Sequence, residues 1–218
     1  MKLLRFLFHH LYHAFAWTYD LVAWLVSLGR WRDWVLSALP YLEGPRVLEL
    51  GHGPGHLQTA MRKKGWLVLG VDESRQMGRL AALRLTRLGL PVALIRSEAQ
   101  SLPFGADCFD SLAATFPTEY IFDPRTLDEA SRVLRPGGRL VVVPTAYIGG
   151  KNVPDRAAAW LFQVTHQGGE ITEALKGRIK TPFAAAGFTV RLETVQIRSS
   201  TVLLIVAEKP HYQPVGRD

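Results

Sequence analysis

The sequence contains little that would mark a secreted or membrane-spanning protein. Cys108 is the only cysteine, so no disulfide can form within the chain, and a reducing compartment is favoured. No stretch reaches the roughly 20 consecutive apolar residues that a transmembrane helix requires. The apolar opening is interrupted by His9 and His10, and no cleavage site of small residues follows, which argues against a signal peptide. We therefore expect a cytoplasmic protein, with peripheral membrane contact as the alternative.

Acidic residues are scarce relative to basic ones. The 19 Asp and Glu residues are outnumbered by 26 Lys and Arg residues, which gives a formal net charge of +7. This balance favours contact with nucleic acid, acidic lipid headgroups or a charged substrate, although a solvated basic surface explains it equally well. With 218 residues, of which 48% are hydrophobic and 21% charged, the chain is predicted to form one globular α/β domain with additions.

A turn signal at Gly44-Pro45 separates two patterns of apolar residues. Before it, helical spacing predicts an N-terminal helical cap over residues 1–44. After it, short apolar strands alternate with helices. The predicted strands cover residues 46–50, 67–71, 92–95, 109–115 and 139–143. One predicted helix follows the first strand and ends at about residue 64, and two more cover residues 75–88 and 127–134. This alternation predicts a doubly wound, Rossmann-like α/β sheet, in which ligands bind at the carboxyl ends of the parallel strands.

The amphipathic helix 75–88 is predicted to direct leucines inward and arginines to water. These leucines are Leu80, Leu83 and Leu88, and these arginines are Arg79, Arg84 and Arg87. Two helices are predicted near the C-terminus, over 155–166 and 171–187, and strands over 189–197 and 201–207. Only three residues separate these last strands, so they are predicted to pair as an antiparallel hairpin and to complete a seven-stranded sheet.

The predicted domain that contains this sheet covers residues 45–210. It includes a helical insertion near residues 147–168. A run of Pro136, Gly137 and Gly138 is predicted to end the helix that precedes the fifth strand.

A glycine-rich turn follows the first predicted strand, in the order Glu49-Leu50-Gly51-His52-Gly53-Pro54-Gly55. Glycines allow the backbone to approach a ligand closely, and the following helix adds free N–H groups. The spacing G-x-G-x-G differs from the G-x-G-x-x-G of dinucleotide sites. The acid at the end of the strand suits a positively charged amino group better than a pyrophosphate. No chemistry is assigned to His52 or Pro54.

Further acids follow the second and third strands. Asp72 can accept hydrogen bonds from both hydroxyls of a ribose. Met77 lies one helical turn later, where it can pack on an adenine ring or simply belong to the core. Glu98 can accept from the adenine amino group while the backbone at Ala99 donates to the ring. The alternative for Glu98 is an ordinary solvated loop acid.

This series of motifs resembles the core of the class I methyltransferases that use S-adenosylmethionine (SAM), over residues 46–143. The matching tracts are VLELGHGPG, GVDESRQM, SEAQSLPF, DCFDSL and RVLRPGGRLVVV. They resemble most closely the branch with the menaquinone and ubiquinone methyltransferases. Glu98 departs from the Asp often found in relatives. The resemblance and the motifs together assign cofactor binding to Tyr19, Glu49, Gly51, Gly53, Gly55, Asp72, Glu73, Met77, Glu98, Ala99, Thr115 and Phe116. In relatives, the tyrosine that corresponds to Tyr19 closes over the methionine end of the cofactor.

The methyl acceptor is expected at the end of the fourth strand, near residues 115–118. Methyl transfer from a sulfonium is an in-line displacement, so the enzyme mainly positions the acceptor. The tract typical of nucleic-acid amino methylases is absent there, and Cys108 lacks the preceding proline of cytosine-C5 enzymes. A general base is needed only for some acceptors. Candidate bases are His10, His13, Tyr147 and His166, each of which can equally be an ordinary surface or packed residue. No histidine and cysteine spacing predicts a metal site.

Aromatic residues in the N-terminal segment and in the insertion suggest an apolar lid over a small lipophilic or aromatic acceptor, although both segments can simply pack on the domain. They are Phe6, Phe8, Tyr12, Phe15, Trp17, Trp160, Leu161 and Phe162. Two other functions remain open: methylation of RNA, and non-catalytic SAM binding. The RNA hypothesis rests on the basic balance and on arginines of helix 75–88, whose predicted outward position fits a solvated face better.

Overall fold

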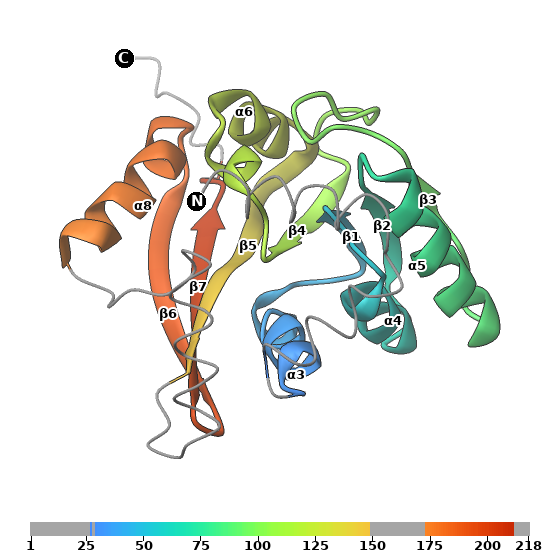
Figure 1. Ribbon diagram of the computed structural model, residues 1–218. Helices are drawn as coiled ribbons and strands as arrows, with labels where there is room; N and C mark the ends of the chain where they lie inside the picture. Colours follow the sequence, from blue (N-terminus) through green and yellow to red (C-terminus); the bar gives the residue numbers. More distant parts are fainter. Residues whose placement is uncertain (1–26, 28, 149–172, 212–218) are drawn as a thin grey trace, which may run out of the picture.

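Seven strands form one twisted sheet in the part of the chain that the structure describes. The structure is a computed structural model that describes residue 27 and residues 29–148 and 173–211. The strand order is β3-β2-β1-β4-β5-β7-β6, and Figure 1 shows helices against both faces of the sheet. The doubly wound sheet with a terminal antiparallel hairpin is therefore confirmed.

The described elements follow the alternation that the sequence predicts after Gly44-Pro45. The strands are β1 (Arg46–Leu50), β2 (Leu67–Val71), β3 (Leu94–Ile95), β4 (Phe109–Thr115), β5 (Leu134–Ile148), β6 (Thr189–Ile197) and β7 (Ser200–Glu208). The helices are α3 (Trp31–Leu36), α4 (His56–Lys63), α5 (Arg75–Arg87), α6 (Pro124–Val133) and α8 (Glu173–Ala185). Short 3-10 turns are η1 (Leu39–Tyr41) and η2 (Glu119–Phe122).

The sheet is parallel from β3 to β5 and antiparallel beyond it. β1 pairs in parallel with β2 and β4, so the ends of these three strands meet at one edge. β7 runs antiparallel to both β5 and β6. Only Arg198 and Ser199 connect β6 to β7, which is too short for a parallel crossover. The last two strands thus close the fold and leave the carboxyl edge of the parallel part for a ligand.

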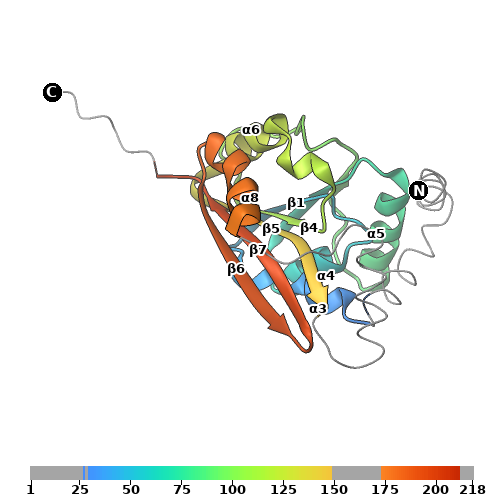
Figure 2. The ribbon, with the colours of Figure 1, turned by 60° about the vertical axis from the view of Figure 1, so that its left-hand side comes forward.

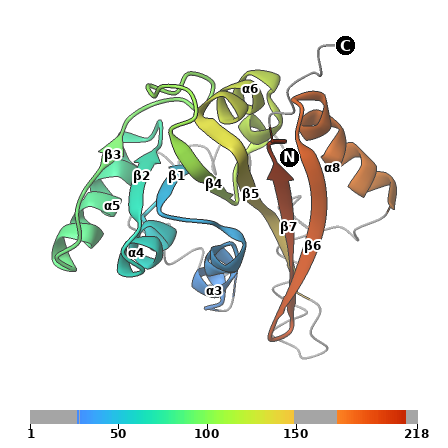
Figure 3. The same cartoon turned by 180° about the vertical axis from the view of Figure 1, so that it is seen from behind.

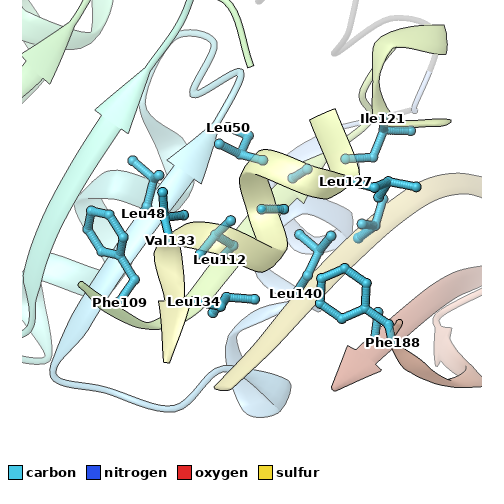
Figure 4. Packing of buried hydrophobic residues seen from close by; sticks show 14 of the residues in the cluster. Leu48, Leu50, Phe109, Leu112, Ile121, Leu127, Val133, Leu134, Leu140 and Phe188 are labelled. Atoms are coloured by element: carbon cyan, nitrogen blue, oxygen red, sulfur yellow. The ribbon is translucent and has the colours of Figure 1, made fainter. Parts of the chain in front are cut away.

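The two faces of the sheet are covered by different helices. On one face, Leu48, Leu112 and Leu140 of three adjacent strands pack with α6 and α8, and Figure 4 shows this core from close by. On the other face, the intervening residues of the strands pack with α3 and α4, and Trp34 is fully buried there. Seen from the side in Figure 2, the helices form a layer on each side of the sheet. Because both faces are covered, the central strands read as continuous apolar runs.

The structure corrects three details of the predicted elements. The third strand is limited to Leu94–Ile95, because only these two residues pair with β2. The fifth strand is longer than predicted and begins at Leu134, directly after α6. The Pro-Gly-Gly run thus lies within the span of β5, and α6 ends before it. A register shift between Val142 and Thr145 accompanies the extension of β5 along β7.

The predicted inner face of the helix at 75–88 is also partly wrong. The residues of α5 that are buried are Met77, Ala81 and Leu85, which follow one another at a spacing of four. Leu83 and Leu88 are instead 50% and 48% exposed, because they lie on the opposite side and at the end of the helix.

The described part of the N-terminal region packs directly on the domain. Trp34 and Val35 of α3 belong to the same core as Val47 of β1 and Leu57 of α4. The rest of the predicted cap, residues 1–26, and most of the predicted insertion at 147–168 lie outside the described residues. Among the described residues, no helix has the length and apolar character needed to cross a bilayer.

Candidate functional site

A cavity of about 450 Å³ opens at the carboxyl ends of β1, β2 and β4. Its volume is in the range of small-molecule sites. Ten residues assigned to cofactor binding from the sequence line it: Glu49, Gly51, Gly53, Asp72, Glu73, Met77, Glu98, Ala99, Thr115 and Phe116. Residues from four separate segments of the chain thus meet at one edge of the sheet. Of the remaining two, Gly55 does not line the cavity and Tyr19 lies outside the described residues.

Each glycine of the turn is required for a different structural reason. Gly53 has φ +50°, and a Cβ added to it would meet no atom within 4 Å, so it would project into open space. A Cβ on Gly55 would lie 3.0 Å from the Cβ of Ala81 in α5, so Gly55 allows α4 and α5 to pack closely. Gly51 has φ +64°, and its backbone N–H donates to the carbonyl of Val71 at 2.8 Å. The turn is therefore anchored on β2 while its backbone at Gly53 stays bare.

Asp72 connects this turn to the start of α5. Its Oδ2 accepts from the backbone N–H of Gly53 at 2.9 Å, and its Oδ1 accepts from that of Ser74 at 2.8 Å. Two backbone hydrogen bonds fix the carboxylate in orientation. Each oxygen can accept further hydrogen bonds, since an ionised carboxylate offers about four acceptor positions.

Glu49 is a buried acid with an unused oxygen. It is 1% exposed, and its Oε2 has no hydrogen-bond partner among the described residues. Burial raises the pKa of Glu49 to about 8, with the nearby charge of Asp72 adding to this effect, while Gln58 and Arg62 favour the ionised form. Such an acid is costly to ionise unless a cation reaches it.

Two polar residues of α4, Gln58 and Arg62, interact with Glu49. Gln58 donates its side-chain N–H to the carbonyl of Leu69 at 3.2 Å, and its Oε1 accepts from Arg62 Nη2 at 3.3 Å. Arg62, which is only 9% exposed, also donates to the carbonyl of Val68. A buried arginine and amide thus interact with the acid, and neither of them lines the cavity.

Tyr120 and His52 are lining residues that sequence reasoning missed. The Tyr120 hydroxyl donates to the carbonyl of Leu50 at 3.2 Å. A Cβ added to Gly51 would lie only 2.6 Å from the hydroxyl oxygen of Tyr120. Burial raises the pKa of Tyr120, so its phenol stays protonated. His52 is 4% exposed, its Nδ1 lies 2.7 Å from the carbonyl of Gly53, and burial lowers its pKa. The neutral ring therefore donates from Nδ1.

On the side near α5, the cavity is lined by Met77 and by the loop of residues 97–100. Met77 and Ala99 are 7% and 9% exposed, whereas Glu73 and Glu98 are exposed to solvent. The N–H of Met77 is capped by the Ser74 hydroxyl at 3.3 Å, which begins α5 beside Asp72. This arrangement suits a flat ring with one polar edge.

The opposite end of the cavity is aromatic. The rings of Trp31 and Phe116 lie 4.3 Å apart between centroids, and Trp34 lies 6.2 Å from Phe116. Phe116 adopts φ +48°, a strained conformation for a non-glycine residue, and its N–H donates to the carbonyl of Val143 at 2.7 Å. The strained backbone directs this ring towards α3 instead of along the strand. Trp31 was not predicted as a site residue, because nothing local to α3 links it to β4.

The candidate bases are not brought into the cavity among the described residues. Tyr147 pairs with Thr201 between β5 and β7 and does not line the cavity. His10, His13 and His166 lie outside the described residues. In the described ranges, no group of acidic, histidine or cysteine side chains has the arrangement of a metal site.

Comparison with known proteins identifies the family. A family model described as a methyltransferase domain matches residues 48–142. A demethylmenaquinone methyltransferase of Thermus thermophilus is 31% identical over 202 residues, which cover 80% of this chain and 90% of that relative. The chain belongs to the class I SAM-dependent methyltransferases. SAM is the cofactor of this family.

Other relatives of this methyltransferase are longer or more distant. A demethylmenaquinone methyltransferase of Clavibacter sepedonicus is 34% identical over 128 residues, and the chain spans 52% of its length. A SAM-dependent methyltransferase of Thermotoga maritima has a TM-score of 0.63 and 19% identity, covering 92% of this chain and 98% of the other. At this identity, the structural likeness shows the shared fold alone.

Two observations on the methyltransferase cavity fit SAM. The unpartnered Oε2 of Glu49 is a buried acceptor suited to an ammonium group. The bare backbone at Gly53 leaves the space that a side chain would fill. The donor set of the cavity therefore agrees with the cofactor of the family.

Proposed function

We propose that this chain transfers the methyl group of SAM to a small lipophilic or aromatic acceptor by in-line displacement. The observation that carries the proposal is the division of one cavity into a polar end, at Glu49 and Asp72, and an aromatic end, at Trp31 and Phe116. A polar, cationic cofactor and an apolar acceptor fit opposite ends of such a cavity.

The polar end is proposed to hold the cofactor. Glu49 would bind the amino group of the methionine part, and Asp72 would accept from the ribose hydroxyls. Met77 and Ala99 would enclose the adenine, with Glu98 at its amino edge and Glu73 at the rim. The backbone of Gly51 and Gly53 would lie against the ligand, and Gly55 would keep the turn in place. When bound, SAM supplies an electrophilic methyl carbon on a sulfonium.

Tyr19 is assigned to the methionine end of the cofactor by resemblance alone. Thr115 and Phe116 are proposed to face the reacting end of the cofactor, because Thr115 ends β4, Phe116 follows it, and both line the cavity. Trp31 and Phe116 would exclude water and align a planar acceptor, since aromatic side chains pack well on flat rings.

Relatives support a quinone-like ring as the acceptor. The relatives from Thermus thermophilus and Clavibacter sepedonicus are named demethylmenaquinone methyltransferases. The aromatic end of the cavity is chemically compatible with such a ring. We therefore propose a reduced quinone precursor with an apolar tail as the first acceptor to test.

The test is transfer of labelled methyl from SAM to defined acceptors by the full chain. We expect transfer to a reduced quinone precursor, and none to unmodified RNA. The Asp72→Ala variant should lose transfer, whereas Asp128→Ala, which removes an exposed acid of α6, should retain it. Transfer to RNA instead would contradict the proposed acceptor class. Tight SAM binding without transfer to any of the acceptors would favour the non-catalytic alternative.

A further inference from the structure

The part of the chain around β2 and β3 carries most of the excess positive charge. Between residues 50 and 97, the only acidic residues are Asp72 and Glu73, and both line the cavity. The basic residues of this segment are Arg62, Lys63, Lys64, Arg75, Arg79, Arg84, Arg87 and Arg96. This segment therefore accounts for nearly all of the formal net charge of +7.

The same segment exposes apolar side chains. Within the described ranges, the large apolar side chains that are strongly exposed all lie between residues 67 and 95. Leu67 is 68% exposed, Leu83 50% and Leu88 48%, and Val92 is 47% exposed. Scattered single apolar residues on a surface are ordinary, but a group of them among basic residues indicates a binding surface.

These apolar and basic residues lie on one side of the molecule. On α5, Arg79, Leu83 and Arg87 follow at a spacing of four and are all exposed, so they form one stripe. Leu88 ends this helix, and Lys63 ends the neighbouring α4, shortly before Leu67 begins β2. Figures 1 and 3 show α4 and α5 side by side, with these ends at the same edge of the sheet. We call Lys63, Leu67, Arg79, Leu83, Arg87 and Leu88 the α5 surface.

We propose that the α5 surface docks on an anionic lipid bilayer. The basic side chains would attract acidic headgroups, and the exposed leucines would enter the boundary between headgroups and acyl chains. This role is independent of methyl transfer and rests on a surface that the cavity does not use.

The chemistry of the α5 surface favours lipid over nucleic acid. Proteins that bind single-stranded RNA stack bases on exposed aromatic side chains. The α5 surface carries leucines in those places, and the nearby Trp66 is only partly exposed, with Lys64 Nζ 5.1 Å from its ring centroid. Exposed leucines contribute little to RNA binding but gain free energy on entering lipid.

The α5 surface is separate from the cavity. The inner side of α5 carries Met77, which lines the cavity, and the outer side carries Arg79 and Leu83. The two sides are separated by one helix diameter, about 10 Å. Because Lys63 and Leu88 lie at the ends of their helices and Leu67 begins β2, the α5 surface extends to the amino edge of the parallel strands, away from the carboxyl edge where the cavity opens. Docking on it would therefore hold the protein at the bilayer without covering the cavity.

The test is co-sedimentation of the full chain with phosphatidylcholine vesicles, with and without phosphatidylglycerol. We expect binding to the anionic vesicles only, and a steep decrease as salt is added. The variant K63Q/R79Q/R87Q should bind about a hundredfold more weakly, since each basic residue contributes roughly fivefold. The control R178Q/K180Q/R198Q removes the same charge from exposed positions on α8 and the β6–β7 turn, and should retain most binding.

A second variant separates lipid from nucleic acid. L83S/L88S should weaken vesicle binding roughly tenfold while SAM affinity stays unchanged, which also shows that the variant folds. Equal binding to neutral and anionic vesicles, or equal losses in the two charge variants, would overturn the proposal. It would also be overturned if L83S/L88S had no effect and a single-stranded RNA displaced the protein from vesicles, because the surface would then be one for nucleic acid.

Discussion

The two ends of the cavity are built in different ways. The polar end consists of Glu49, the last residue but one of β1, and Asp72, which directly follows β2, and backbone hydrogen bonds fix Asp72 within it. The aromatic end joins Trp31 of α3 to Phe116 after β4, through a ring contact between distant parts of the chain. Local motifs therefore specify the polar end, whereas tertiary packing specifies the aromatic end. Substitutions at the two ends should therefore affect different ligands.

The largest effect is expected at Asp72. Asp72→Ala removes the proposed ribose acceptor and also leaves the N–H groups of Gly53 and Ser74 without their partner. SAM affinity should fall about three-hundredfold, since several hydrogen bonds to a charged group are lost together. Calorimetric titration measures this loss, with Asp128→Ala as the matched control. Unchanged affinity would refute the ribose role and remove the distinction between the ends.

Two glycines, Gly53 in the turn and Gly65 outside the cavity, provide a test and a matched control for contact between the ligand and the turn backbone. Gly53 and Gly65 both have positive φ, +50° and +79°, and a Cβ added to either residue would meet no atom within 4 Å. Alanine at either position should cost about 1 kcal/mol of stability, because of the left-handed conformation. Only Gly53→Ala should also weaken SAM binding, by roughly thirtyfold through a blocked approach of the ligand. Equal SAM affinity in the two variants would show that the ligand does not lie against the turn.

Glu49 should make SAM binding depend on pH. Its pKa of about 8 means that the free site is protonated at neutral pH, and a bound ammonium would require its ionisation. Affinity should therefore rise about tenfold per pH unit between roughly pH 6 and 7.5, with release of a proton. Calorimetry in buffers of different ionisation enthalpy detects that proton. In Glu49→Gln both the slope and the proton release should vanish, and a slope that persists would assign the titration to another group.

The aromatic end should affect the acceptor alone. Trp31→Ala removes one of the two rings in contact at this end and should raise the acceptor KM about fivefold, as expected for loss of an aromatic contact. SAM affinity should change less than about twofold, and Trp31→Phe should restore most of the acceptor affinity. Steady-state kinetics with each ligand varied in turn separates the two constants. A parallel loss of SAM affinity would mean that the two ends are not independent.

Glu49 should also make the stability of the protein depend on pH. The folded pKa of Glu49, about 8, lies above its ordinary value of 4.5. The folded state therefore holds a proton that the unfolded state has released, so this group lowers stability as pH rises from about 4.5 to 8. Glu49→Gln removes this dependence. The free energy of unfolding of the variant minus that of the unsubstituted protein should therefore be larger at pH 8 than at pH 5, by at least about 1 kcal/mol. Urea denaturation at the two pH values measures it, and a constant difference would contradict the raised pKa.

Much of the polar end could be predicted from the sequence because it follows strand ends. Glu49 lies near the end of β1 and Asp72 directly after β2, and both strands are recognisable by their apolar runs, so the parallel sheet brings the two acids to one edge. Tyr120 and His52 were missed for different reasons. Tyr120 reaches Leu50 across 70 residues, and no local signal indicates that contact. His52 lies within the glycine-rich turn, where no local pattern predicts burial, and only the fold buries it.

The fold was predicted well where periodicity is strong and less well where packing decides. The hairpin of β6 and β7 followed from a connection too short for a crossover. The inner face of α5 was misassigned because Leu83 and Leu88 are apolar, yet the close approach of Ala81 to Gly55 sets the orientation of the helix. Likewise, β3 shortens to two residues because only Leu94 and Ile95 meet β2. Composition alone could not distinguish these cases.

A crystal structure with S-adenosylhomocysteine bound tests the central claim most directly. The account predicts the ligand amine on Glu49, its ribose hydroxyls on Asp72, and its sulfur directed towards Phe116 and the aromatic end. A ligand bound in another cavity, or in the reverse direction with its sulfur near Met77, would contradict it.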